Sequence, residues 1–298
     1  NTTGHSNTAV GKDAMLVNST GIENVAVGTL ALDANTTGGS NVAVGQAAMS
    51  SNSTGSSNTA VGKSALASNT TASFNTAFGD SALGANSTGG NNTAIGYQVL
   101  VSNTTASQNT GVGHNTLSAN TTGAGNVGIG YQVLASNTTA NYNTALGYDA
   151  LNKNTTGTEN TAVGAFCLDA CTTGSDNTAI GKSALSALTT GTNNIAMGDS
   201  ALENLTTGFV NTALGIESLE SLTNSSGNVA VGYQAMQDSN PANNTAVGYQ
   251  AFKAISTGTS AVAVGLQAGL AVTTGSFNTL IGRGAGEAPN AFIRTLAT

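Results

Sequence analysis

Residues 58–74 read Asn-Thr-Ala-Val-Gly-Lys-Ser-Ala-Leu-Ala-Ser-Asn-Thr-Thr-Ala-Ser-Phe, and this unit recurs along almost the whole chain. With Asn58 as the first place, the second place is Thr, Val or Ile in all seventeen copies and the fourth is always apolar. The fifth place is always glycine, at a spacing of 17 residues with one step of 16. A fixed period below about 50 residues indicates a stacked array, in which each unit buries its apolar face against its neighbours.

The first five places of the unit predict a short strand that ends at a bend. The second to fourth places, such as Thr59-Ala60-Val61, show the period of two and the β-branched residues that are typical of strands. A glycine directly after a strand fits a bend that needs positive φ or room for crowded backbone. These bend glycines are Gly11, Gly28, Gly45, Gly62, Gly79, Gly96, Gly113, Gly130, Gly147, Gly164, Gly181, Gly198, Gly215, Gly232, Gly248, Gly265 and Gly282.

The third place leaves one face of the predicted strand almost bare. Alanine or glycine stands there in every copy but the last, which has Leu280. A face of small residues lets another backbone come close, which suits either a thin solenoid interior or a tight contact between identical chains. Both interpretations stay open at the level of sequence.

The eighth and ninth places carry a short Ala-Leu pair, as in Ala65-Leu66 and Ala150-Leu151. We expect its large residue to fill the core from a second strand. A helix is the competing interpretation, but a helix needs about ten residues to be worth forming, and glycine returns too soon on both sides. The Asn-Thr-Thr-Gly sequence that closes most units is typical of turns.

These features together predict an all-β, parallel β-solenoid with one coil per 17-residue repeat and seventeen coils over residues 1–286. Residues 287–298 are expected to form an exit segment toward a cap or another module, because the pattern decays after Arg283. Parallel stacking places each residue about 4.8 Å from its copy. At the twelfth place we therefore expect an asparagine ladder bonded along the stacking direction, made of Asn18, Asn35, Asn52, Asn69, Asn86, Asn103, Asn120, Asn137 and Asn154.

The twelfth place changes character after Asn154. It becomes Cys171 and then leucine in three copies, with isoleucine and valine further on: Leu188, Leu205, Leu222, Ile255 and Val272. Every other place of the repeat continues, so we interpret the change as a different cross-section within one solenoid. The same twelfth-place asparagines match the N-glycosylation pattern, but a glycan every 4.8 Å or so is crowded, which favours an unmodified ladder.

Composition removes several classes of function. Only 7 % of residues are charged, the net charge is −7, and the seven Lys and Arg form no basic stripe, so we expect no nucleic-acid partner. No stretch approaches the roughly 20 apolar residues of a spanning helix, so no membrane insertion is predicted. The repeat runs nearly end to end without a linker, which favours one elongated domain.

The phrase Asn-Thr-Ala-Val-Gly, followed by Ala-Leu and Asn-Thr-Thr-Gly, resembles the head repeats of trimeric autotransporter adhesins, and still more the related repeats of phage tail fibres. The resemblance covers residues 7 to about 286. It implies a left-handed parallel β-roll in which three chains pack side by side as a homotrimer. It also implies an extracellular place, on a cell surface or a virion, and attachment to a glycan or protein of a host surface. The adhesin coils are shorter than the 17-residue unit found here.

Few residues stand out as chemical sites. Five tyrosines share the sixth place, where aromatic rings at an outer turn would stack on sugars or anchor a protein partner. Lysine and aspartate also occupy this place in other copies, so an exposed, tolerant position is the competing interpretation. The five are Tyr97, Tyr131, Tyr148, Tyr233 and Tyr249.

Redox, metal and catalytic chemistry have little support. Cys167 and Cys171 lie four residues apart, and their spacing allows a disulfide or two packed free thiols. His5 and His114 lie about six coils apart, and no carboxylates have ligand spacing, so we predict no metal site. We also predict no cofactor and no enzymatic activity, because a nucleophile needs a base and an orienting partner in one pocket.

The repeat and the resemblance together predict a structural and adhesive fibre module, the shaft or head of a surface adhesin or phage-like tail fibre. One alternative is an extracellular filament whose subunits stack end to end through unpaired strand edges. Another is an ice-binding solenoid, because regular threonine columns on a flat face order water.

Overall fold

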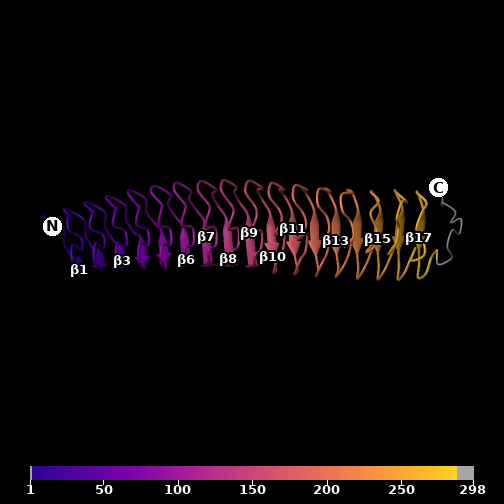
Figure 1. Ribbon diagram of the computed structural model, residues 1–298, viewed down its shortest axis with the longest axis horizontal. Helices are drawn as coiled ribbons and strands as arrows, with labels where there is room; N and C mark the ends of the chain where they lie inside the picture. Colours follow the sequence, from indigo (N-terminus) through magenta and orange to yellow (C-terminus); the bar gives the residue numbers. More distant parts are fainter. Residues whose placement is uncertain (1, 287–298) are drawn as a thin grey trace. The chain divides into compact units, whose positions relative to one another are not determined.

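The computed structural model describes residues 2–286 and shows a parallel β-solenoid without any helix in those residues. Each repeat forms one short strand that begins at its second place, so the seventeen strands delimit about sixteen turns (Figure 1). The predicted exit segment, residues 287–298, lies outside the described residues. The strands are β1 Thr8–Val10, β2 Val25–Val27, β3 Val42–Val44, β4 Thr59–Val61, β5 Thr76–Phe78, β6 Thr93–Tyr97, β7 Thr110–His114, β8 Val127–Tyr131, β9 Thr144–Tyr148, β10 Thr161–Val163, β11 Thr178–Ile180, β12 Ile195–Met197, β13 Thr212–Leu214, β14 Val229–Val231, β15 Thr245–Val247, β16 Val262–Val264 and β17 Thr279–Ile281.

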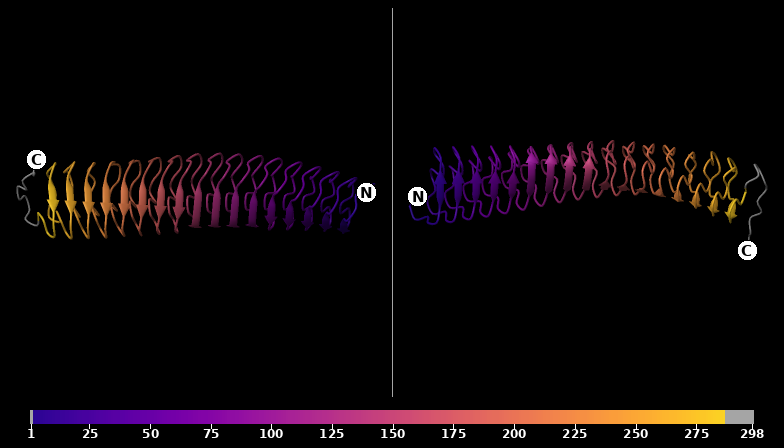
Figure 2. Two further views of the ribbon diagram at one scale, coloured as in Figure 1. Left: turned by 180° about the vertical axis from the view of Figure 1, so that it is seen from behind. Right: turned by 90° about the horizontal axis from the view of Figure 1, so that it is seen from below.

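The chain divides into two compact units, Asn1–Ala145 and Leu146–Thr298. The first holds β1 to β8 and the second β10 to β17, and the division falls within β9. Inside each unit neighbouring strands are parallel and lie side by side, one to a coil (Figure 2). The single 16-residue step keeps this register, because Val229 pairs with Thr245 and the missing residue is taken from the turn between them.

Buried and exposed residues alternate along the strands, and this shows where the small residue of the third place lies. Ala26, Ala60 and Ala179 are fully buried, whereas the second and fourth places of their strands stay partly exposed or exposed. The alanine face is therefore the thin interior of the solenoid. The alternative of a contact between identical chains through this face is wrong, because the third place is exposed only in the first strand, at Ala9, and is buried in every strand from β2 to β17.

The leucine at the ninth place fills the core, but it does not lie on a second strand. Leu66 is fully buried, yet its segment is a turn in which Ser64 and Leu66 have φ of 56° and 51°. Left-handed residues alternating along the turn curl the chain while its amides still bond the next coil, as Leu66 N–H does to Ala82 O at 3.0 Å. The prediction of a second strand is wrong. Burial of the leucine side chain in the core outweighs the energetic cost of placing this residue in the left-handed region of the backbone.

The bend after a strand needs glycine for its conformation and, where a further coil is stacked on it, for space as well. Gly11 has φ of 135°, and a Cβ placed there would lie 2.6 Å from the carbonyl oxygen of Gly28 in the next coil. No L side chain fits a distance of that kind, so a substitution would push the coils apart.

Interior volume is balanced between neighbouring coils at two positions, although Val133 is followed by Ala145 and not by glycine. The β-branched Val99 and Thr116 replace the usual alanine of the eighth place, and glycine replaces alanine at the third place of the following coil. A Cβ on Gly111 would overlap Val99, and one on Gly128 would lie 2.7 Å from Thr116 Cγ2. At Gly111 and Gly128 this close packing leaves no room for an extra methyl group.

Candidate functional site

The twelfth-place asparagines form a buried ladder. In the first unit, Asn35 Nδ2 donates to Asn18 Oδ1 at 2.7 Å and also to Gly38 O at 2.9 Å, and the same pair of bonds recurs in the coils up to Asn137. The ladder side chains are buried, with at most 1 % exposed. Both hydrogens of each such amide are thus used inside the coil, so an N-linked glycan has no access to these positions in the folded chain.

A second ladder, at the first place, escaped the sequence reasoning. Asn24 Oδ1 accepts a hydrogen bond from the backbone N–H of Asn41 at 2.9 Å, and Asn41 Nδ2 donates one to Gly55 O at 2.9 Å. Asn52 of the twelfth-place ladder donates to the same oxygen at 3.0 Å, so the two ladders converge on one carbonyl per coil. The signal was in the sequence: sixteen of seventeen copies begin with asparagine, with Ala261 as the exception.

In the second unit the twelfth-place ladder gives way to apolar packing. Cys171, Leu188 and Leu205 are fully buried where the first unit has asparagine. The first-place ladder continues beside them, and Asn177 Nδ2 still donates to Gly191 O at 2.9 Å. The interior carbonyl therefore keeps one side-chain donor when the second is lost.

Both cysteines are free thiols in the interior of the second unit. Cys167 Sγ donates to Ala179 O at 3.1 Å, and Cys171 Sγ donates to Gly174 O at 3.6 Å. Burial raises the pKa of Cys167 to about 12 and that of Cys171 to about 11. Of the two states allowed by their spacing, the structure has the packed, protonated thiols.

The sixth-place aromatics lie outside the coils and stack on one another. The rings of Tyr97 and His114 are 5.1 Å apart and those of His114 and Tyr131 5.2 Å, both nearly parallel, and Tyr233 stacks on Tyr249 at 5.3 Å. Strands β6, β7 and β8 extend through this place, which carries the rings on the outer face of the sheet. Stacked rings turn their faces to each other and their edges to solvent, an arrangement that disfavours a sugar-stacking platform.

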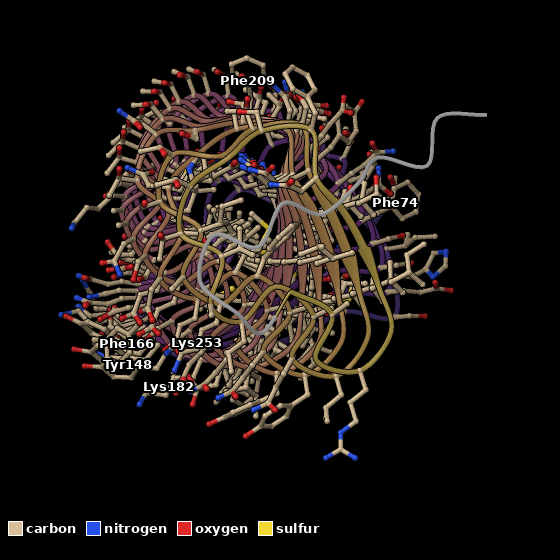
Figure 3. All side chains as sticks on the ribbon, turned by 90° about the vertical axis from the view of Figure 1, so that its right-hand side faces the viewer. Phe74, Tyr148, Phe166, Lys182, Phe209 and Lys253 are labelled. Carbon is tan, nitrogen blue, oxygen red and sulfur yellow. The ribbon has the colours of Figure 1, made fainter. Side chains whose placement is uncertain are left out.

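The fifth of these tyrosines has a different partner. Tyr148 makes an edge contact with Phe166, a seventh-place residue of the next coil, at a centroid distance of 5.4 Å. Both project from the outside of their coils, at the same corner of the end-on view (Figure 3). Sequence reasoning missed His114 and Phe166 as members of aromatic contacts, because a stack across coils is visible only once the coils are paired.

The fourth place forms an apolar stripe on the outer face of each unit, which we call the outer stripe. Its side chains alternate with the buried alanines and are 36 % to 72 % exposed at ten positions. No charged residue stands at the second or fourth place of any repeat. The outer stripe consists of Val10, Val27, Val44, Val61, Phe78, Ile95, Val112 and Ile129 in the first unit and Leu146, Val163, Ile180, Met197, Leu214, Val231, Val247, Val264 and Ile281 in the second.

Metal-binding groups do not gather in the part of the chain that the structure describes. Within residues 2–286 no three His, Cys, Asp or Glu side chains come close enough to share an ion. His5 bonds the neighbouring Ser6 hydroxyl at 3.2 Å, and His114 lies within the tyrosine stack. Among the same residues no helix has the length and hydropathy to cross a membrane.

No protein-family model and no curated protein matches the chain.

Proposed function

We propose that this chain is a structural and adhesive module, the shaft or head of a homotrimeric fibre such as a surface adhesin or a phage-like tail fibre. The observation that carries the proposal is the outer stripe, a row of apolar, uncharged side chains that recurs in every coil and is exposed at ten positions. Monomeric soluble proteins rarely leave contiguous apolar surface of this kind open to water.

The partner that best fits the outer stripe is another copy of the same chain. The apolar side chains recur once per coil, about 4.8 Å apart, and only a surface with the same repeat can meet each of them in turn. Burying the equivalent of one methylene per coil is worth about 0.8 kcal/mol. The repeat multiplies this small gain over many coils, which suits side-by-side association of parallel chains.

The adhesive part of the proposal, and an extracellular place on a cell surface or virion, are supported by the resemblance of the repeat to adhesin heads and tail fibres. A rigid stack of coils presents its outer turns at fixed intervals, so a host-surface glycan or protein would be bound by exposed turns. Adhesion is tested by retention of the chain on surfaces coated with glycans or with matrix protein. We expect retention on one of them, and loss on all would leave a structural shaft without adhesive function.

The threonine columns give ice binding less support than the outer stripe gives assembly. Of each Thr-Thr pair, the first hydroxyl is used inside the fold, as when Thr36 Oγ1 donates to Ser53 O at 3.0 Å. The second residue, such as Thr37, is exposed. Each such coil thus contributes one exposed threonine, and the resulting single column along the stack is a narrow face for ordering water.

The assembly is tested by placing charge on the outer stripe. Phe78→Glu with Ile95→Glu would bury two unpaired carboxylates between copies, which costs several kcal/mol each, so we expect the sedimentation velocity to fall from that of a trimer to that of a monomer. The matched control, Ser51→Glu with Ser68→Glu, adds the same charge on exposed turns and should stay trimeric. An assembly that survives the stripe variant would refute the proposed interface.

A further inference from the structure

The seventeenth place of the repeat, just before the first-place asparagine, has a pattern of its own. It is Ser, Asn, Gln, Asp, Glu or Gly in thirteen copies and apolar or aromatic in four. These four residues, which we call the posts, follow one another at 68, 68 and 67 residues, which is four coils each time. The first unit holds Phe74 and Tyr142, and the second holds Val210 and Phe277.

The posts are unfavourable for an isolated coil on two counts. They are 64 %, 65 %, 57 % and 70 % exposed, and their φ values are 63°, 58°, 56° and 63°. Left-handed backbone is tolerated by the polar residues and glycines of the other thirteen copies but is an outlier for bulky and β-branched side chains. The buried leucines of the ninth place are stabilised in this conformation by the core, whereas the posts have no such burial.

Each post precedes a large aliphatic or aromatic residue of the outer stripe in the sequence. Each is followed four residues later by Phe78, Leu146, Leu214 or Ile281, which include the only phenylalanine and the only two leucines of the stripe. The seventeenth, second and fourth places face outward, whereas the first and third places between them are buried in most coils. In β5 and the residues before it, Phe74 and Phe78 therefore both face outward, and they are 64 % and 55 % exposed. Phe209, beside Val210, is 56 % exposed as well, and Figure 3 shows Phe74 and Phe209 projecting from the outside of their coils.

We propose that the posts set the axial register between neighbouring copies of this chain, an inference that rests on the proposed side-by-side trimer. Near-identical coils create a register problem, because sliding one copy by a single coil, about 4.8 Å, brings equivalent stripe residues together again. In a closed ring of parallel copies, equivalent residues of the copies lie at the same position along the ring axis. A slip of one, two or three coils then sets each post opposite a polar residue or glycine and leaves its apolar side chain in water. A slip of four coils restores the match but loses four coils of overlap, so the posts act against slipped assemblies.

The test replaces the posts by the residue that the same place carries elsewhere. The variant is Phe74→Ser, Tyr142→Ser, Val210→Ser and Phe277→Ser, and it should fold at least as well as the parent because Ser40, Ser57 and Ser260 occupy this place with φ of 56°, 57° and 55°. The matched control makes the same change in coils without posts: Asn91→Ser, Glu159→Ser, Asn193→Ser and Asn243→Ser. A single spin label at Lys63→Cys, in a background with Cys167→Ala and Cys171→Leu, reports distances between copies by pulsed electron resonance, and light scattering reports the mass.

The expected result is a threefold mass and one narrow distance for the parent and the control. The post variant should keep the threefold mass but give several distances, from copies displaced by whole coils. One narrow distance in a trimeric post variant would overturn the register role while leaving the trimer intact. A post variant that falls to a monomer would also overturn it, because the posts would then be the adhesive contact itself. A monomeric parent would overturn the proposed assembly and the register together, and the mass alone identifies that case.

Discussion

At the scale of single residues, the fold depends on asparagine side chains that replace water inside a narrow coil. Each ladder amide joins its own turn to the neighbouring coil, so the interior is polar and satisfied along much of the first unit. Buried polar groups are stable only when every donor and acceptor is paired. One substitution therefore affects two coils at once.

Asn52→Ala tests this dependence. It would leave Asn35 Oδ1 and one hydrogen of Asn69 without their present partners, and each unsatisfied buried group costs about 1–3 kcal/mol. We expect the free energy of unfolding, measured by urea titration with circular dichroism, to fall by about 2–5 kcal/mol. Ser51→Ala, at the neighbouring exposed place, should change it by less than about 0.5 kcal/mol. Equal effects of the two would show that the ladder carries no stability.

The buried thiols predict a pH dependence. The raised pKa values, about 12 for Cys167 and about 11 for Cys171, mean that both stay protonated in the folded chain after the unfolded chain has begun to ionise near its ordinary pKa. The folded state then binds more protons than the unfolded state, so stability falls as pH rises from about 9, by at most about 1.4 kcal/mol per thiol per pH unit. Urea titrations from pH 8 to 10.5 should show this slope, and Cys167→Ala with Cys171→Leu should show less of it. An unchanged slope in that variant would contradict the burial of the thiols.

At the scale of the element, the short strand and its parallel stacking follow from residue types that recur at the same places of every repeat. Each strand has only three residues in most coils, too few for independent stability, and it forms because the coils on both sides supply partners. Small residues at the third place set how thin the interior is, and the eighth and ninth places fill it.

The volume balance between coils is tested by a double-mutant cycle. Gly111→Ala should destabilise the chain by about 1–3 kcal/mol because its new methyl group overlaps Val99. Val99→Ala alone should destabilise it by leaving a cavity. The double variant recreates the Ala–Ala packing of Ala65 and Ala77, so its loss should be smaller than the sum by at least 1 kcal/mol or so. Additive losses would mean that the two places do not share one space.

Sequence reasoning reached the strand, the coil period and the twelfth-place ladder, since these depend on residue types at fixed intervals. It placed Leu66 on a second strand, because nothing in the preference of leucine suggests the left-handed turn that core packing imposes on it. It also missed Asn41 as a ladder member, although the first place is nearly invariant. Contacts such as that of Tyr97 with His114 depend on which coils are neighbours, and they follow only after the register is known.

At the scale of the whole molecule, the exposed apolar residues are what the single chain leaves unexplained. The solenoid buries its alanines and leucines within one chain, but the outer stripe and the posts remain in water. The chain has few charges to keep such surfaces apart, with 7 % charged residues and a net charge of −7. The proposed association of copies through these residues would account for both features, because the outer stripe would supply contact area and the posts would set the axial register.

The mass of the unaltered chain in solution tests the central claim most directly. Light scattering during size-exclusion chromatography, over a wide range of loading concentrations, compares that mass with the 29.1 kDa of one chain. The account predicts a threefold mass that does not change on dilution into the micromolar range. A mass of one chain at every concentration would contradict it, because the outer stripe would then face water by itself.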